Sequence, residues 1–217
     1  MENAGREGAI ALGIDQQWVE KVELPSKRRH NVELLPTLAD LFAHHGLSPT
    51  DLDELYVSLG PGSFTGLRIA IATAKILSLT IPGLKLVGVP TMDVLAHQHA
   101  DTTGHVAVCM NIKRGTMYTG VFNAGQAVVP PGLRTVEALL ADAPRPLAIV
   151  SEVDTGIAEG EGVQALPPES AKPDAAATWL VGRSMAQAGC CTKADNLMPL
   201  YIREPEAVTL WNELGRD

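Results

Sequence analysis

The string LGPGSFTGLR at residues 59–68 carries the strongest chemical signal in the chain. It follows a short apolar segment and precedes a long one, which predicts a turn from a strand into a helix. Gly60 and Gly62 allow backbone conformations closed to other residues, and Pro61 fixes one dihedral between them. Ser63 can cap the helix, whose free N–H groups can bind an anion. The local sequence favours a tight structural turn; the alternative is an anion or partner site formed by Gly60, Pro61, Gly62, Ser63 and Thr65.

Other reactive side chains give weaker signals. The string matches neither a Walker loop nor GxGxxG. Ser63 has no evident histidine base nearby in the sequence, which disfavours a hydrolase. His97 and His99 lie on a predicted helix at a spacing that points their rings to different faces, so we interpret them as exposed polar residues. We predict no catalytic residue, no metal ligand and no cofactor held by this chain alone.

Composition narrows the class of protein. The chain has 217 residues, a net charge of −8, 46% hydrophobic and 4% aromatic residues. A nucleic-acid binder that acts alone normally carries a basic surplus, so any RNA contact is expected to depend on a partner. The three cysteines make no disulfide framework, and neither a signal peptide nor an apolar run long enough to span a membrane is visible. We therefore expect a cytoplasmic protein.

The elements around the glycine string predict a first lobe at residues 1–101. A hairpin at 8–24 is followed by a helix at 31–45, in which Pro36 predicts a kink or the true start. A strand at 55–59 leads through the string into a helix at 63–79 that is apolar nearly all round, and therefore buried on several sides. A strand at 86–89 and a helix at 91–97 complete the lobe.

The remaining residues, 102–217, predict a smaller second lobe whose tail packs back on the first. Its strands are expected at 106–112, 117–122 and 147–150, with a helix at 135–143. Residues 156–173 are rich in glycine, proline and glutamate and indicate irregular structure, and Asp174 is a good N-cap for a last helix. The order predicts an α/β fold with mixed sheets flanked by helices.

Several motifs resemble the bacterial TsaB (YeaZ) family. GPGSFTGLRI, followed by an alanine-rich helix and GVPTMDVLA, is similar to the family signature GPGSFTGVRIG…GVSTL. Arg29-His30 before Leu34-Leu35-Pro36 resembles the family's REH…ILP helix, and Pro199–Ala207 resembles its P-x-YLR tail. The resemblance is strong from about residue 30 to residue 96 and weak in the second lobe.

The resemblance implies an actin-like, ribonuclease-H-like duplicated fold and a scaffold role. TsaB-like proteins pair with a catalytic paralogue, TsaD, and with an ATPase, TsaE, to place threonylcarbamoyl on an adenosine beside the tRNA anticodon. ATP and divalent metal are expected in those partners, tRNA contact is indirect, and a homodimer is expected for the isolated chain. The first two helices would form the interface, through Leu34, Leu38, Leu41, Gly66, Arg68, Ala70, Ile71, Ala74 and Lys75.

Three departures from the related sequences bear on catalysis. The catalytic paralogue carries HxxxH where this chain has Thr91 and Leu95, and neither can replace an imidazole as a metal ligand. The family's aliphatic first strand and Asp/Glu-Thr-Ser become Met1 followed by Glu2-Asn3-Ala4, so either the start is assigned late or the strand is truncated. The DAR…EVY stretch of the second lobe becomes a basic turn at Lys113 and Arg114. An ATP-dependent actin-superfamily enzyme and a homodimeric module unrelated to tRNA stay open as alternatives.

Overall fold

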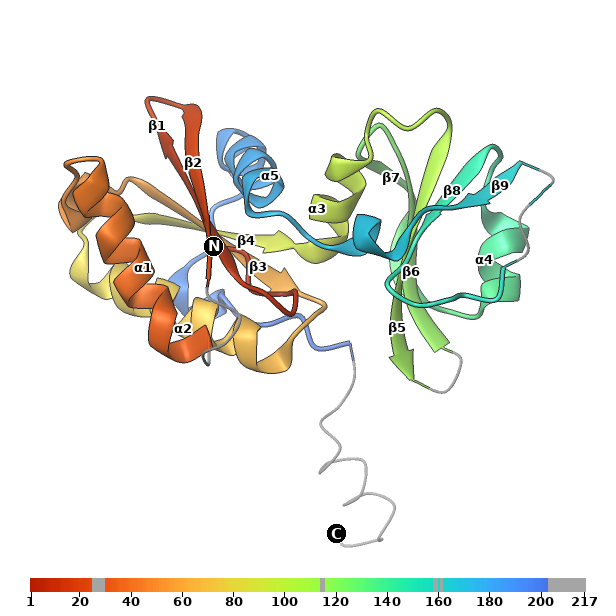
Figure 1. Cartoon of the computed structure of the whole chain (residues 1–217), viewed down its shortest axis with the longest axis horizontal. Helices are drawn as coiled ribbons and strands as arrows, with labels where there is room; N and C mark the ends of the chain where they lie inside the picture. The colour runs from red at the N-terminus through yellow and green to blue at the C-terminus, as the bar shows by residue number, and fades with distance from the viewer. Residues whose placement is uncertain (25–29, 114–115, 158–159, 161, 203–217) are drawn as a thin grey trace, which may run out of the picture.

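Two lobes lie side by side in the part of the chain that this computed structural model describes, residues 1–24, 30–113, 116–157, 160 and 162–202. In Figure 1 the first lobe holds the chain start, and the second is reached through α3 (Thr91–Gln98). The α/β architecture predicted from the sequence is confirmed, and α3 ends close to the predicted boundary between the lobes.

The first lobe is built on two pairs of strands. β1 (Ala9–Ile14) and β2 (Gln17–Glu23) form an antiparallel hairpin, and β3 (Glu54–Gly60) pairs with β4 (Lys85–Pro90) in parallel. Asp15 and Gln16 both have positive φ, as the tight turn of a hairpin requires. The first-lobe sheet is thus split into two halves. Among the described residues, only Met1 and Glu2 link these halves through backbone hydrogen bonds, Met1 to β3 and Glu2 to β1.

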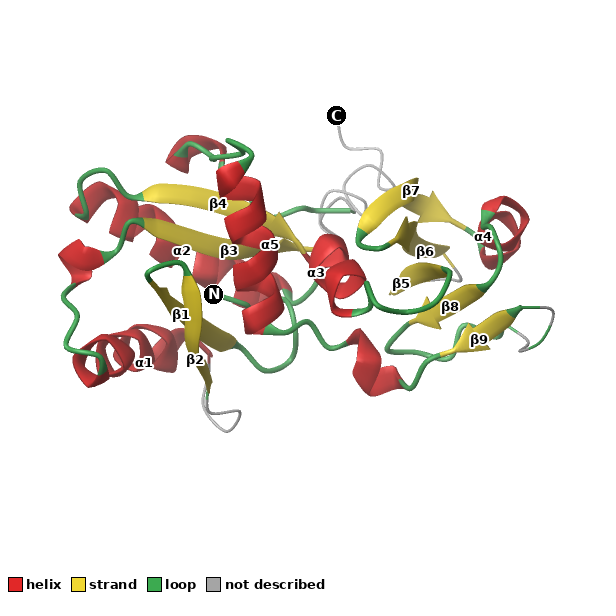
Figure 2. Ribbon diagram, turned by 90° about the horizontal axis from the view of Figure 1, so that it is seen from above, coloured by secondary structure: helices red, strands yellow, loops and turns green. Residues whose placement is uncertain are grey.

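Helices cover both faces of these strands. α1 (His30–His44) and α2 (Phe64–Thr80) pack on one face, while α5 (Ala175–Gln187) returns from the second lobe to cover the other face (Figure 2). The alternation of β3 explains this division, because Leu55 and Val57 pack with the α1–α2 side and Tyr56 packs with α5. Pro36 lies inside α1 and does not begin it, contrary to one reading of the sequence.

The second lobe is a five-stranded sheet in the order β7-β6-β5-β8-β9. β5 (His105–Lys113), β6 (Thr116–Asn123) and β8 (Leu147–Val150) match predicted strands, and α4 (Val136–Asp142) matches the predicted helix. β7 (Gln126–Arg134) and β9 (Val163–Ala165) were not predicted. β7 contains Pro130 and Pro131, which argue against a strand except at the edge of a sheet, and the edge is where β7 lies.

Candidate functional site

The glycine loop, defined here as Gly60–Thr65, carries the chain from β3 into α2. Gly60 has a φ of 101°, in the left-handed region that favours glycine. Ser63 caps the helix, since its Oγ accepts a hydrogen bond from the N–H of Gly66 at 3.2 Å. The predicted strand-to-helix turn and its cap are confirmed.

The inner side of the glycine loop is filled by the first residues of the chain. The N–H of Ser63 donates to the carbonyl oxygen of Ala4 at 2.7 Å. A Cβ atom at Gly62 would lie 2.4 Å from that same oxygen, and one at Gly66 would lie 2.3 Å from the carbonyl oxygen of Asn3. These glycines therefore let two backbones approach closely, which supports the structural reading. An anion site at Gly60, Pro61, Gly62, Ser63 and Thr65 stays a prediction.

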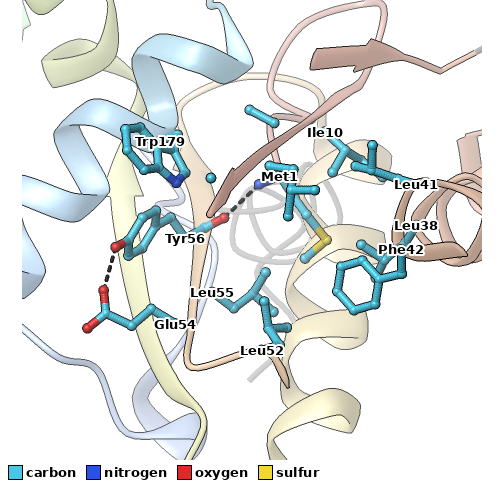
Figure 3. A pocket seen from close by; sticks show the side chains of 13 residues that line it. Met1, Ile10, Leu38, Leu41, Phe42, Leu52, Glu54, Leu55, Tyr56 and Trp179 are labelled. Carbon is cyan, nitrogen blue, oxygen red and sulfur yellow. Dashed lines mark hydrogen bonds between the residues drawn. The ribbon is translucent and has the colours of Figure 1, made fainter. Parts of the chain in front are cut away.

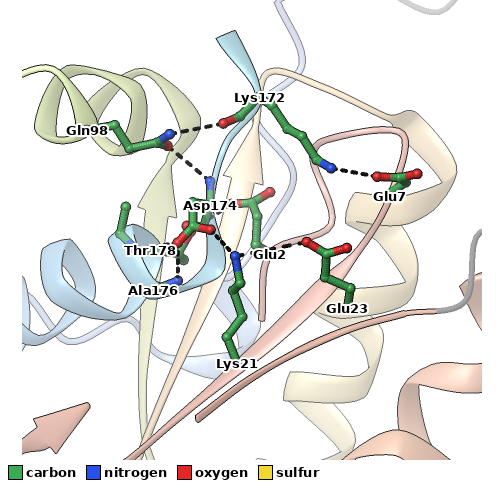
Figure 4. Close-up of polar contacts among 10 residues, drawn as sticks. Glu2, Glu7, Lys21, Glu23, Gln98, Lys172, Asp174, Ala176 and Thr178 are labelled. Carbon is green, nitrogen blue, oxygen red and sulfur yellow. Dashed lines mark hydrogen bonds and ion pairs between the residues drawn. The ribbon is translucent and has the colours of Figure 1, made fainter. Parts of the chain in front are cut away.

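The same chain start carries a buried carboxyl group, that of Glu2 (Figure 4). Glu2 accepts hydrogen bonds from the hydroxyl of Thr178 at 2.8 Å and from the N–H of Ala4 at 2.6 Å. Burial raises the pKa of the Glu2 carboxyl, and it lowers the pKa of the Met1 amino group to about 6 against the nearby charge of Glu2. Both groups are thus biased toward their neutral forms. This pair ties the chain start to α5 and β3.

The predicted interface residues fall mostly on the wrong side of their helices. Seven are buried: Leu34, Leu38, Leu41, Gly66, Ala70, Ile71 and Ala74. They pack against the strands or the chain start and cannot meet a partner without opening the core, so this prediction is corrected for them. Arg68 is exposed and Lys75 is half-buried, so these two keep access to solvent.

The outward side of α2 carries a different row of exposed residues, apolar except for Arg68, which we call the outer face: Phe64, Arg68, Ala72, Ile76 and Leu79. Ile76 is 61% exposed and Leu79 is 83% exposed, and Leu35 of the neighbouring α1 is 55% exposed. Sequence reasoning predicted Arg68 as an interface residue but missed the apolar positions of this face, because α2 is apolar nearly all round. The small residues of α2 could have indicated its inward side. Ala70 and Ala74 lie one turn apart, on the side that packs closely against the rest of the lobe.

Arg68 is held at one end of the outer face by two aromatic rings. Its guanidinium lies 3.8 Å from the centre of the Phe64 ring, and its Nε donates to the hydroxyl of Tyr201 at 2.8 Å. The two rings lie 5.5 Å apart, centre to centre. The arrangement fixes a cation at the surface beside the glycine loop, and it fixes the segment around Tyr201 against α2. The family-like tail beyond Ile202 lies outside the described residues.

Candidate nucleophiles and metal ligands were also located. Ser63 Oγ is engaged in its cap, Thr91 and Leu95 are both buried, and His99 contacts the carbonyl of Ser170 at 2.8 Å. Burial raises the pKa of the Cys109 thiol to about 11. The basic turn predicted at Lys113 and Arg114 lies outside the residues whose side chains the structure describes.

One group that sequence reasoning missed could hold a metal ion: Glu20, His44 and His45. Glu20 Oε2 lies 2.7 Å from Nε2 of His45 and 3.3 Å from Nδ1 of His44. A hydrogen bond from His45 is the main cause of the lowered pKa of Glu20. Hydrogen bonding between carboxylate and imidazole accounts for this geometry, which joins β2 to the end of α1.

Most of the chain matches a known protein family. A family model described as TsaD, tRNA N6-adenosine threonylcarbamoyltransferase, matches residues 23–186. The tRNA threonylcarbamoyladenosine biosynthesis protein TsaB of Bacillus subtilis (strain 168) is 30% identical over 118 residues, 54% of this chain and 50% of that protein. The aligned part therefore spans half of the Bacillus protein. An uncharacterized protein of Mycobacterium tuberculosis is 30% identical over 185 residues, 84% of this chain and 79% of the relative.

Solved structures agree on the fold. A crystal structure described as an uncharacterized protein with similarity to peptidase YEAZ from Pseudomonas aeruginosa superposes with a TM-score of 0.77. It is 19% identical, and the superposition covers 93% of this chain and 97% of that one. The two-lobe, actin-like fold expected from the sequence is thereby confirmed. Among the described residues, no helix is long and apolar enough to cross a membrane.

Proposed function

The chain belongs to the TsaB (YeaZ) family, and on that premise we propose that it is a non-catalytic scaffold subunit in the formation of threonylcarbamoyladenosine in tRNA. Its partner is a TsaD-type catalytic subunit, joined in turn by a TsaE-type ATPase. Those partners bind ATP and the divalent metal ion and make most of the contacts to tRNA. The complex acts in the cytoplasm. Relatives named for this biosynthesis support the pathway.

The observation that carries the scaffold role is the outer face of α2. Large apolar side chains are exposed on two neighbouring helices, Ile76 and Leu79 on α2 and Leu35 on α1, and the small Ala72 on the outer face leaves room for another backbone. Exposed large apolar side chains gathered on neighbouring helices are typical of a protein interface. Arg68, held between two rings at one end, adds a charged anchor of the type enriched at binding hot spots.

The residues at the positions where the catalytic paralogue binds metal support a non-catalytic role for this subunit. In the alignment of motifs with the catalytic paralogue, the metal-binding positions correspond to Thr91 and Leu95. Both residues are buried, and Leu95 lies in the core of the second sheet. A hydroxyl and an isobutyl group give a divalent metal no imidazole ligand. The reaction would then take place on the partner, and this subunit would hold that partner in its active form.

Co-purification with the TsaD-type subunit of the same organism tests the proposal. Ile76→Glu and Leu79→Glu place charges on the outer face and should abolish the complex while leaving the circular dichroism spectrum unchanged. Leu133→Glu is the matched control, because Leu133 is 53% exposed but lies on β7 of the second lobe. Loss of the complex in the control as well would count against a specific face.

Two other results would point to the alternatives. The outer face can also pair with a second copy around a twofold axis, so a homodimer of the isolated chain is expected. A homodimer that persists when the catalytic subunit is added would favour a module unrelated to tRNA. Nucleotide binding by the isolated chain in calorimetry would favour an ATP-dependent enzyme. Binding of the catalytic subunit at the expense of the homodimer would support the scaffold role.

A further inference from the structure

Glu20 on β2 and two adjacent histidines at the end of α1 form a cluster that the scaffold role does not use. The carboxylate oxygen Oε2 of Glu20 lies 2.7 Å from Nε2 of His45 and 3.3 Å from Nδ1 of His44. The three atoms all lie within 4.8 Å of one another, and the described residues hold no second group of this kind. Two imidazoles and one carboxylate are a ligand set that zinc takes in proteins.

The backbone of β2 directs Glu20 toward α1. In the hairpin Glu20 lies opposite Leu12, and one extra residue of β2, Val19, forms a bulge beside it. Bulges re-aim the side chains next to them. Directly opposite residues of antiparallel strands share a face, and Leu12 is buried in the same core as the inner residues of α1. Glu20 therefore projects on the α1 side, whereas Lys21 projects on the other side and pairs with Asp174.

The two histidines reach one point because they use different ring nitrogens. Successive residues of a helix point about 100° apart around its axis, so equivalent nitrogens of adjacent histidines diverge. Here the near nitrogen Nδ1 of His44 and the far nitrogen Nε2 of His45 approach the same oxygen, with ring centres 5.0 Å apart. The His45 side chain is 20% exposed and that of His44 is 72% exposed. His45 is thus held by its surroundings, while His44 can adjust to an ion.

The packing of α1 holds both elements of the cluster in place before any ion binds. Leu38, Leu41 and Phe42 of α1 pack in the same core as Ile10 of β1 (Figure 3). β1 in turn pairs along its length with β2, the strand that carries Glu20. The ligands therefore come from elements whose relative position the core already fixes, as a preorganised site requires.

The electrostatics of the cluster favour a cation. The hydrogen bond from His45 is the main cause of the lowered pKa of Glu20, so the carboxyl is biased toward the charged form that a metal needs. The carbonyl groups at the end of α1 form the negative end of the helix dipole, where positive charge is stabilised. The chain as a whole carries a net charge of −8, which attracts cations to its surface.

We propose that Glu20, His44 and His45 bind one zinc ion. A tetrahedral zinc ion with ligands at about 2.0–2.2 Å separates neighbouring ligand atoms by about 3.3 Å. The contact between Glu20 and His44 already has this length, and the contact between Glu20 and His45 must lengthen by about half an ångström as the ion replaces the hydrogen bond. Each neutral imidazole would then carry its proton on the nitrogen that does not face the ion.

Three protein ligands leave a fourth position of the zinc ion for water. The bound ion would join β2 to the end of α1 more firmly than the hydrogen bonds do, because it binds the folded chain and not the unfolded one. The inference rests on the geometry of this cluster and is independent of the proposed scaffold function.

The test measures zinc binding to the untagged full-length chain by calorimetry. Cys190 and Cys191 are both exposed, and thiolates are good zinc ligands, so both are changed to serine in every protein. Glu20→Gln removes the charged ligand, and His44→Ala removes an exposed imidazole. His97→Ala is the matched control, because His97 is an exposed histidine in another helix, α3.

We expect the parent to bind one zinc ion per chain and to gain about 5 °C in Tm when zinc is in hundredfold excess over its Kd. Loss of an outer-shell partner alone costs about 10–100-fold in metal affinity, so each ligand variant should lose at least about tenfold. His97→Ala should bind zinc as the parent does. Magnesium, which prefers oxygen ligands, should not displace zinc.

Equal zinc affinity in the parent and in both ligand variants would overturn the proposal, and so would an equal loss in His97→Ala. The visible spectrum of the parent with cobalt in place of zinc gives a second measurement that needs no ligand variant to fold. A tetrahedral cobalt spectrum would support the site. An octahedral one would mean that the ion keeps most of its water at the surface, and it would count against the three-ligand site.

Discussion

Gly66 occupies the first turn of α2 directly beneath the chain start. An exposed helix-interior glycine changed to alanine normally gains up to about 1 kcal/mol in the free energy of unfolding. Here the new methyl carbon would lie 2.3 Å from the carbonyl oxygen of Asn3, whose own N–H is bound to Ser58 Oγ at 3.0 Å. Because that backbone is held on both sides, we expect Gly66→Ala to lose about 1–3 kcal/mol instead.

Urea unfolding measures whether Gly66→Ala lowers the free energy of unfolding, whereas a glycine-to-alanine change in an exposed helix normally raises it. Ala72→Gly on the exposed side of the same helix serves as the control, and it should cost about 1 kcal/mol through helix propensity alone. A Gly66→Ala protein that is more stable than the parent would show that Asn3 can move, and that the close approach of the two backbones is not needed.

The Met1 amino group gives a pH dependence to folding. Its pKa falls from the ordinary 8.0 to about 6 because burial disfavours the charge. Between pH 6 and pH 8 the unfolded chain therefore binds more protons than the folded one, and this group makes stability rise with pH by about 2 kcal/mol. Glu2 works in the opposite sense, because its pKa is raised and stability falls as pH increases above the ordinary value of 4.5.

Removing the opposing group isolates the amine. In Glu2→Gln we expect the free energy of unfolding to increase from pH 6 to pH 8, as measured by urea titration at fixed ionic strength. Acetylation of the amino group in the same variant should remove this slope. A slope that survives acetylation would assign it to other titrating groups, and the Met1 amine would then have no share in it.

At the scale of elements, α5 depends on a cap that also serves as an ion-pair partner (Figure 4). Asp174 Oδ1 accepts hydrogen bonds from the N–H groups of Ala176 and Ala177, and Oδ2 lies 2.6 Å from Lys21 Nζ on β2. Burial alone would raise the pKa of Asp174, but the hydrogen bonds from Lys21, Ala177 and Ala176 outweigh it and lower the pKa. These contacts therefore favour the charged form of the cap.

Asp174→Ala should cost about 1–2 kcal/mol of stability, and Asp174→Asn, which keeps the acceptor, should cost less. The difference between aspartate and asparagine should shrink as pH falls through the lowered pKa of Asp174, because the protonated carboxyl no longer attracts Lys21. Thermal unfolding followed in steps from pH 7 into the acid range measures this. Equal losses in both variants at pH 7 would assign the stability to the ion pair with Lys21.

Sequence patterns predicted most elements of the fold, and the failures have physical causes. The strands and helices around residues 55–97 were predicted because their apolar runs end at glycine and proline. β7 was missed because edge pairing tolerates Pro130 and Pro131, which a central strand would not. The outward side of α2 was misjudged because Ile76 and Leu79 are as apolar as the buried Leu67 and Ile71. Packing against the strands decides which side is inward, and periodicity alone does not.

At the scale of the whole molecule, the lobes are linked by shared helices. α5 follows the second sheet in sequence but packs on β1, β3 and β4 of the first lobe. α3 lies between α5 and the second sheet (Figure 2). Val94 packs with the α5 side, while Met92 and Leu95 pack with β5, β6 and β8. The predicted boundary between residues 101 and 102 divides the chain into two consecutive segments. The core of each lobe, however, contains residues from both segments.

This shared packing predicts that the lobes unfold together. Leu95 is 1% exposed within the core of the second sheet, so Leu95→Ala should cost about 2–5 kcal/mol. If α3 couples the lobes, hydrogen exchange should accelerate equally at the N–H groups of Val108 in β5 and Val57 in β3, because both exchange through one global opening. Leu79→Ala at the exposed side of α2 is the control. It should change the free energy of exchange at each of these two N–H groups by no more than about 0.5 kcal/mol. Faster exchange at Val108 with Val57 unchanged would instead mean that the second lobe opens alone, and that α3 and α5 stay with the first.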